Sequence, residues 1–321
     1  MKMTKRLKSI DAIYWFVVAF FVIAVIFVPG FGNINALTRL LSKACVLIIL
    51  ACGVHFTVLN GGVDFTSTAL LALTTVVGAS IMKVDGPFGG SGLGICVSLI
   101  AMLLLGTGFG IINGFSIVTF KMPSFIVTMA TQMIVNGLAV VYTGGASVSG
   151  LPDAFIAFGE GKIIIFPFIL IVTIGVVIVT HTISRKTRYG RQLYAVGTNH
   201  KAALISGISP KKVIFKVYVI SGICAAIAGI VELAYMQSGS VNYGSTMFND
   251  IMGSIIVGGT SPAGGRGKIM NTVMGAFLII IVDSVFNILN VPYYFITLTK
   301  GLIILVAASL DLIKKAAELK K

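Results

Sequence analysis

The side chains that could take part in chemistry are few in this sequence, and most of them stand in apolar stretches. Thr128, Gln132 and Asn136 recur every four residues, which places their hydroxyl and amide groups on one stripe of a helix. Asp64 follows a Gly-Gly pair between two apolar blocks. Such groups can line a path for a polar solute or hydrogen-bond a neighbouring helix, and the spacing favours neither interpretation. Neither of them requires the chain to break a covalent bond.

Two opposite charges, Asp283 and Lys300, stand in successive apolar stretches at equal distances from the turn between Val291 and Pro292. With a rise of 1.5 Å per residue, each residue lies about 13 Å from that turn along its own helix, and the two helices are antiparallel. An unpaired charge is costly inside a bilayer, so we expect a structural ion pair. A site for a coupling ion is the alternative.

Motifs of the common enzyme classes are absent from the sequence. A phosphate-binding GxxxxGK[ST] motif fails because Pro262 and Ile269 stand where a glycine and a hydroxyl residue are needed. There is no HExxH, no GxSxG with a triad and no pair of carboxylates on one helix face. We therefore predict no enzyme activity, no ATP hydrolysis by this chain alone and no metal site. The residues set aside as scattered, or as buried free thiols, are His55, His181, His200, Cys45, Cys52, Cys96 and Cys224.

The composition places these residues in a membrane protein. The chain has 321 residues, of which 57% are hydrophobic and 11% charged, with a mean hydropathy of +1.03, whereas a soluble domain carries about 25% charged residues. We predict an all-α polytopic membrane protein, forming one membrane domain over residues 1–321, with about ten transmembrane helices. The predicted spans are 12–28, 43–59, 66–82, 93–118, 123–143, 163–180, 213–236, 250–260, 269–289 and 293–312.

The orientation follows from the basic residues. Residues 181–216 form the longest polar interruption and contain eight Lys or Arg but no Asp or Glu. Together with the two ends of the chain they hold 16 of the 24 basic residues. By the positive-inside rule, residues 1–11, 181–212 and 313–321 are predicted to be cytoplasmic. The net charge of +14 is thereby explained without a nucleic-acid partner.

Glycine marks the irregular parts of the membrane domain. Two glycine-rich stretches, 60–67 and 258–267, interrupt apolar blocks, and we predict broken or re-entrant helices that face the protein interior. Gly106, Gly110 and Gly114 recur every four residues, which predicts close packing of one helix against another.

The basic loop contains a short helix with its own start and stop signals. Thr198 or Asn199 can cap the start, Gly207 can adopt the left-handed stop, and Pro210 follows. Helical spacing places Ala202, Ile205 and Ile208 on one face. An apolar face on a cytoplasmic loop predicts a docking surface for a partner protein.

These motifs resemble those of a known family. The pattern from Gly197 to Ile208, followed by Ser221-Gly222, resembles the coupling-helix region of monosaccharide (ribose-type) permease subunits of ABC importers. The resemblance implies a ten-helix permease of a bacterial cytoplasmic (inner) membrane, surrounded by lipid. It also implies a second permease subunit, identical or different, an extracytoplasmic solute-binding protein and a separate ATPase that holds the ATP and Mg, with no cofactor on this chain. Further matching segments, in the same order, are 60–64, 123–128, 250–251, 256–260, 264–267 and 300–302.

The resemblance also assigns roles to residues. Docking to the ATPase falls on Asn199, Ala202, Ala203, Ile205 and Gly207. Our own candidates for lining the path or facing the substrate are Asp64, Phe125, Thr128, Gln132 and Asn136. The chain departs from the family after Asp64, at Asn136, where a basic residue is usual, and near Asn242, where a proline is usual. These departures put a pentose substrate in doubt.

Two alternatives to a sugar importer stay open. The first is an ABC permease for nucleosides or a furanose sugar. The second, from another class, is an ion-coupled secondary transporter that uses Asp64, Asp283 and Lys300. A stand-alone transporter has no need of a docking helix, which is why we prefer the importer.

Overall fold

The protein is almost entirely helical. The computed structural model describes the backbone of residues 12–319 and the side chains of residues 13–309. A hairpin of two short antiparallel strands, β1 (Lys162–Ile163) and β2 (Phe166–Pro167), is the sheet of this described part. The helices are α2 (Ala12–Phe27), α3 (Ile34–Leu59), α4 (Thr66–Met82), α5 (Gly92–Thr119), α6 (Ser124–Thr143), α7 (Asp153–Glu160), α8 (Ile169–Lys186), α9 (Arg188–Thr198), α10 (His200–Ile205), α11 (Pro210–Met236), α12 (Met247–Val257), α13 (Ile269–Ile288) and α14 (Tyr293–Leu319).

The predicted helical membrane protein is confirmed. Among the described residues, six helices are long and apolar enough to cross a membrane, namely α3, α5, α6, α8, α11 and α13. Four shorter apolar helices, α2, α4, α12 and α14, complete the set, and each of the ten predicted spans overlaps one of them. The chain is therefore an all-α multi-pass membrane protein.

Several predicted spans had the wrong ends, and the largest errors are in the second span, the sixth span and the last, which ends at Leu319 rather than at 312. The second span begins at Ile34 rather than at 43, because Asn33 caps it and accepts a hydrogen bond from the backbone N–H of Asn35 at 3.2 Å. The span predicted at 163–180 begins instead at Ile169 and continues to Lys186. The residues before it form the β-hairpin, in which Pro167 lacks the N–H that a helix interior needs. Hydropathy does not distinguish an apolar hairpin from an apolar helix turn.

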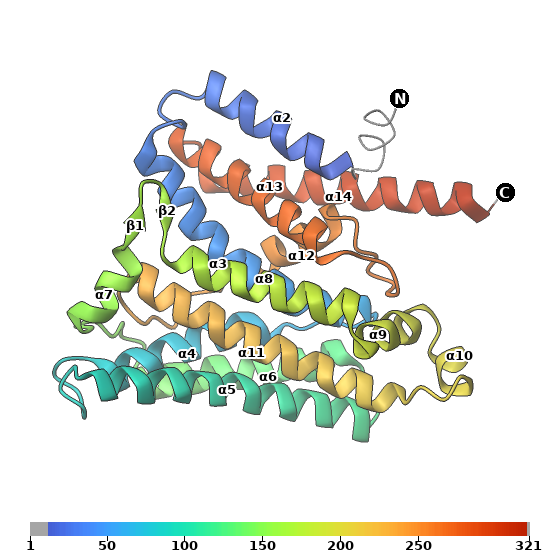
Figure 1. The fold of residues 1–321 in the computed structure, drawn as a ribbon, viewed down its shortest axis with the longest axis horizontal. Helices are drawn as coiled ribbons and strands as arrows, with labels where there is room; N and C mark the ends of the chain where they lie inside the picture. The colour runs from blue at the N-terminus through green and yellow to red at the C-terminus, as the bar shows by residue number, and fades with distance from the viewer. Residues whose placement is uncertain (1–11, 320–321) are drawn as a thin grey trace.

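Helices α3 and α11 form the centre of the molecule (Figure 1). Helix α11 packs against α3, α4 and α5, and α3 packs in addition against α8, α12 and α13. The outer helices are α6 on α4, α2 on α13, and α14 on α12. In the most apolar 18-residue stretch of α3, 89% of the residues are buried inside the protein. A chain with so apolar a centre and so apolar a surface is built for surroundings of lipid.

The predicted glycine stripe does permit close helix packing. Gly106 on α5 contacts the backbone of Gly222 on α11 so closely that a Cβ atom would overlap the Gly222 carbonyl oxygen. A Cβ on Gly110 would lie 2.6 Å from the carbonyl oxygen of Tyr218, and one on Gly114 would lie 2.8 Å from that of Phe215. Small residues of this kind let two backbones approach where lipid provides no hydrophobic drive.

The prediction that all four cysteines are buried is wrong for Cys96, which is exposed.

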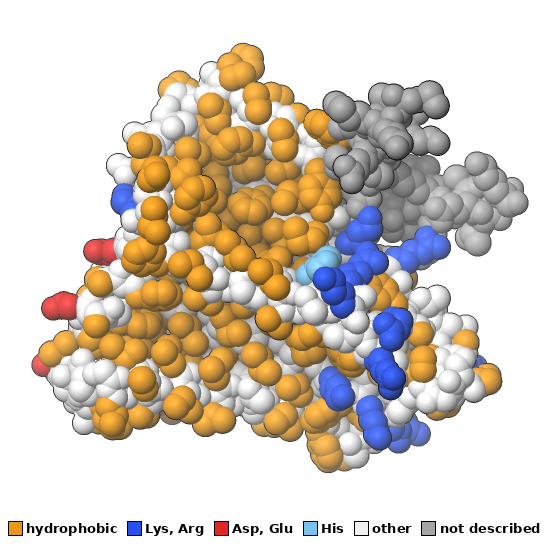
Figure 2. Space-filling view, in the orientation of Figure 1, with side chains coloured by type: hydrophobic (Ala, Val, Ile, Leu, Met, Phe, Trp, Pro, Cys, Tyr) orange, Lys and Arg blue, Asp and Glu red, His pale blue; other side chains and the backbone are white. Residues whose placement is uncertain are grey.

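Charge is distributed between the two ends of the helix bundle. Figure 2 shows most Lys and Arg side chains gathered at the end that carries α9 and α10, with Asp and Glu at the opposite end and apolar side chains between. Helix α2 begins and α14 ends at the basic end (Figure 1). The cytoplasmic tail predicted for 1–11 lies outside the described residues, as do the side chains of the tail predicted for 313–321.

Candidate coupling and translocation site

The short helix predicted in the basic loop is confirmed as α10. Asn199 caps it, its side-chain oxygen accepting a hydrogen bond from the backbone N–H of Ala202 at 3.0 Å. Gly207 follows the helix with φ +77°, which glycine adopts at little cost, and Pro210 opens α11. We call residues 199–207 the coupling segment. The helix before it, α9, was not predicted and is capped by Thr187, whose hydroxyl accepts from the N–H of Gly190 at 3.1 Å.

The exposed face of the coupling segment differs from the predicted one. Ala203 is buried, whereas Leu204 is 61% and Ile205 87% exposed. Ala202 is exposed too, but Ile208 is half-buried and donates its backbone N–H to the carbonyl of Ala203 at 3.0 Å. Helical periodicity failed here because the helix ends after six residues and the turn at Gly207 directs Ile208 inward. The apolar face consists of Ala202, Leu204 and Ile205.

Three distant chain segments meet beside the coupling segment at a contact that we call the glycine junction, formed by Leu59, Gly61, Gly197, Gly264 and Gly265. The backbone N–H of Gly265 donates to the carbonyl of Leu59 at 2.8 Å. A Cβ on Gly197 would overlap that same carbonyl and lie 2.8 Å from the nitrogen of Gly265. A Cβ on Gly264 would lie 2.9 Å from both Gly197 O and Gly61 N. The two glycine-rich stretches predicted to face the interior therefore touch each other and the end of α9.

Side chains of α9 strengthen this connection. The hydroxyl of Tyr194 donates to the carbonyl of Gly267 at 2.8 Å, and the guanidinium of Arg185 lies 5.6 Å from the centre of the Tyr194 ring. The hydroxyl of Tyr189 donates to the carbonyl of Val213 at 3.3 Å, and burial raises the pKa of this tyrosine. Helix α9 is thus fixed to the 258–267 stretch and to α11.

Asp64, predicted to face the path, lies in the protein interior with 2% of its surface exposed. One carboxylate oxygen accepts a hydrogen bond from the hydroxyl of Ser221 at 2.6 Å. The other accepts from the backbone N–H of Thr66 at 3.0 Å. The residue therefore connects the start of α4 to α11, and its place in a solute path stays a prediction.

The polar stripe on α6 runs from the protein interior to the surface. Thr128 is buried and donates to the carbonyl of Ser124 at 2.9 Å. Gln132 is half-buried and donates to the hydroxyl of Thr68 on α4 at 3.2 Å, whereas Asn136 is exposed, as is Phe125 beside the stripe. Hydrogen bonding between helices is thus present at Gln132, and a role of the stripe in a solute path stays a prediction.

A buried chain of polar groups that we did not predict extends the stripe inward. The amide of Asn113 on α5 donates to the hydroxyl of Thr66 at 2.8 Å, and the hydroxyl of Thr131 donates to the side-chain oxygen of Asn113 at 2.7 Å. In the sequence, the signal for this buried asparagine was its place next to Gly114, in the stripe of small residues that packs α5 against another helix. These hydrogen bonds join α4, α5 and α6.

The oppositely charged pair is in contact, with one more member than predicted. Lys300 on α14 lies 2.7 Å from a carboxylate oxygen of Asp283 on α13 and 2.8 Å from one of Asp250 on α12. A second bond to Asp250, at 3.0 Å, uses the third ammonium proton. The three side chains are 12% to 21% exposed. One lysine thereby holds three helices, and we call these residues the Lys300 cluster.

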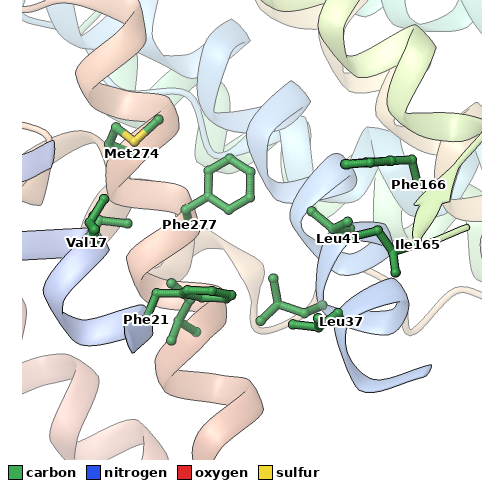
Figure 3. Close-up of a pocket in the computed structure, with 11 residues that line it drawn as sticks. Val17, Phe21, Leu37, Leu41, Ile165, Phe166, Met274 and Phe277 are labelled. Atoms are coloured by element: carbon green, nitrogen blue, oxygen red, sulfur yellow. The ribbon is translucent and has the colours of Figure 1, made fainter. Parts of the chain in front are cut away.

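A cavity of about 290 Å³ opens between α2, α3, α13 and the hairpin (Figure 3). Phe277 and Met274 of α13 face Leu37 and Leu41 of α3 across it. All its described lining residues are apolar. Sites that orient a small polar ligand contain a few placed polar groups, so this cavity is unsuited to a sugar.

We expect Asp64→Ala to lower the free energy of unfolding by about 2 kcal/mol, because it leaves the Ser221 hydroxyl and the Thr66 N–H buried without an acceptor. Ser221→Ala should cost about 1 kcal/mol, and the double variant less than the sum of the two. Thermal unfolding of the purified protein measures all three. Additive effects would contradict the contact.

The chain matches known permeases over most of its length. Residues 36–307 match the family described as branched-chain amino acid transport system / permease component. It is 32% identical to the ribose import permease protein RbsC of Escherichia coli (strain K12), covering 88% of this chain and 87% of that protein. For the D-allose transport system permease protein AlsC of the same strain the identity is 31%, over 94% and 93%. For the galactose/methyl galactoside import permease protein MglC of Haemophilus influenzae it is 27%, over 98% and 99%. No solved structure matches.

Proposed function

Because the chain belongs to the family of branched-chain amino acid transport system permease components, and its relatives import ribose, allose and galactose, we propose that it is the membrane-spanning subunit of an ATP-driven monosaccharide importer. In this role it catalyses no bond chemistry. It alternates between states that are open to one side of the membrane and then to the other. Nucleosides and furanose sugars are the alternative cargoes.

The proposed topology has ten membrane-spanning helices with both ends in the cytoplasm of a bacterial cell and the chain in the inner membrane. The basic end of the molecule supports this orientation, because α9, α10, the start of α2 and the end of α14 all lie there. The shorter apolar helices α4 and α12 complete the spans next to the irregular 60–65 and 258–267 stretches. The glycine junction covers the irregular backbone of both stretches with protein, as such backbone needs at a membrane.

The proposed partners are a separate ATPase that carries ATP and Mg, an extracytoplasmic binding protein and a second permease subunit. The observation that supports the ATPase most directly is Ile205, which is 87% exposed on a helix with a buried anchor, Ala203. An apolar residue so exposed at the basic end, on a rigidly capped helix, fits a groove in a partner protein.

The glycine junction supplies a route for coupling. When the ATPase moves the coupling segment, Gly197 moves with it and presses on Leu59 and Gly265, with no side chain between the backbones to absorb the motion. Leu59 ends α3 just before the turn to α4, and Gly265 lies just before α13. A displacement at the docking surface therefore reaches both broken stretches at once.

The test is truncation of the apolar face of the coupling segment. We expect Leu204→Ala with Ile205→Ala to weaken binding of the ATPase subunit at least tenfold and to uncouple ATP hydrolysis from sugar uptake, because both side chains are exposed and free to enter a groove. Copurification in mild detergent and uptake by vesicles of the reconstituted complex measure the two effects. Ile178→Ala, on the exposed side of α8, is the matched control.

Two results would overturn the proposal. The first is full sugar-stimulated ATPase activity and uptake in the double variant. The second is uptake by the chain alone, without the ATPase, driven by a proton or sodium gradient in vesicles free of ATP. That result would instead indicate the ion-coupled transporter that uses Asp64, Asp283 and Lys300.

A further inference from the structure

A second cavity, of about 1020 Å³, lies at the basic end of the molecule between α2, α8, α12, α13 and α14. Its lining has two parts. Three cations line one part: Arg185 at the end of α8, with Arg266 and Lys268 just before α13. Apolar side chains line the other, including Leu278 on α13 and Leu302 on α14. Among the described lining residues there is no Asp or Glu.

The two parts lie at different depths. The cations lie beside α9, because Arg185 lies over the ring of Tyr194, whose hydroxyl donates to the carbonyl of Gly267. Helix α9 belongs to the end of the molecule where Lys and Arg gather (Figure 2), which is the level of lipid headgroups in a membrane. Helix α13 starts at Ile269, so Leu278 lies about 14 Å further along the helix, at the level of the hydrocarbon. The ligand that fits such a cavity is anionic at one end and has an apolar portion at least about 14 Å long.

The guanidinium groups define the anion more closely. Two arginines and one lysine from two separate chain segments line the same cavity, and the planar guanidinium binds phosphate oxygens in pairs. Arg185 is held in place over the ring of Tyr194, whose hydroxyl is bonded to the backbone of Gly267. A neutral sugar matches neither the cations nor the apolar wall.

We propose that this cavity binds an anionic phospholipid of the inner leaflet, its phosphate at Arg185, Arg266 and Lys268 and an acyl chain along α13 and α14. The lipid then contacts the 258–267 stretch beside the glycine junction. Neutral lipids lack the charge that these cations attract, and a free anion lacks the apolar portion. The site is distinct from the coupling segment and from the polar stripe on α6, so it does not depend on which solute is carried.

The test is native mass spectrometry of the full chain released from nanodiscs that contain equal parts of phosphatidylglycerol and phosphatidylcholine. We expect phosphatidylglycerol to be retained selectively. Arg266→Gln with Lys268→Gln should weaken its retention about 25-fold, or about fivefold per cation. The matched control is Lys211→Gln with Lys212→Gln, which removes the same charge from two exposed lysines that do not line the cavity. It should retain the lipid as the parent chain does.

A second variant tests the apolar half without touching the charges. Leu302→Trp fills the cavity from a side chain that is 53% exposed, so the fold tolerates it, and retention should fall several-fold. Equal retention of both lipids would overturn the proposal, as would an unchanged Arg266/Lys268 variant. Binding of millimolar inorganic phosphate to a chain that retains no lipid would also overturn it, because a free anion would then be the ligand.

Discussion

Gly197→Ala is expected to abolish uptake by the complete importer. An added methyl group overlaps the carbonyl oxygen of Leu59 and lies 2.8 Å from the nitrogen of Gly265, and both of these are backbone atoms that cannot turn aside. Overpacking of this kind costs about 1 to 3 kcal/mol. Moving α9 away to relieve it opens the glycine junction, through which the coupling segment acts. Uptake and ATPase activity of the reconstituted complex measure the effect.

The control for this substitution is Gly175→Ala on α8, where nothing lies within 4 Å of the added atom. Alanine favours a helix over glycine by about 1 kcal/mol, so this variant should be as stable as the parent or slightly more so, with normal uptake. Size-exclusion chromatography separates a folded but uncoupled Gly197 variant from an unfolded one. Normal uptake by folded Gly197→Ala protein would refute the coupling route while leaving the importer itself intact.

Lys300→Met is expected to lower the free energy of unfolding by about 3 to 5 kcal/mol, because it leaves the carboxylates of Asp250 and Asp283 side by side without their cation. The triple variant Lys300→Met, Asp250→Asn and Asp283→Asn should recover most of the lost free energy of unfolding, because no unpaired charge remains. Thermal unfolding and the yield of folded protein in detergent measure both variants. Lys211→Met, at an exposed position, is the control and should change stability little.

The third member of the Lys300 cluster alters one expectation. For a simple pair, exchanging Asp283 and Lys300 should preserve assembly. In the structure, a carboxylate at position 300 would face Asp250, so Asp283→Lys with Lys300→Asp should be less stable than the parent chain. If the exchanged protein proved as stable as the parent, Asp250 would not be part of the interaction.

Hydropathy and charge predict the helices and the basic end because both depend on local composition. Each of the ten apolar stretches overlaps a helix, and the signals around α10, Asn199 at its start and Gly207 after it, lie within a few residues of each other. The hairpin before α8 escaped detection because its residues are as apolar as those of a helix. Local pattern also misplaced the exposed face of the coupling segment, where one turn at Gly207 decides the direction of Ile208.

The candidate site was predicted in parts but not as an assembly. Gly-rich sequence identified the stretches at 60–67 and 258–267, but their contact joins Leu59 to Gly265, which are about two hundred residues apart. Asp283 could be predicted as a partner of Lys300, because α13 and α14 follow one another and the two residues lie equally far from the turn between them. Asp250 could not be predicted, because its helix, α12, is not adjacent to α14 in the sequence. Contacts of this kind depend on the packing of whole helices, which one sequence does not display.

The burial of α3 has a consequence for how the protein is made. This helix leaves the ribosome well before two of the neighbours that enclose it, α11 and α13. Its buried histidine, His55, finds its hydrogen-bond partner Thr272, at 2.8 Å, only after more than two hundred further residues have been translated. Helices α11 and α13 are therefore what complete the centre of the molecule, and α3 reaches its final packing only after they have been made.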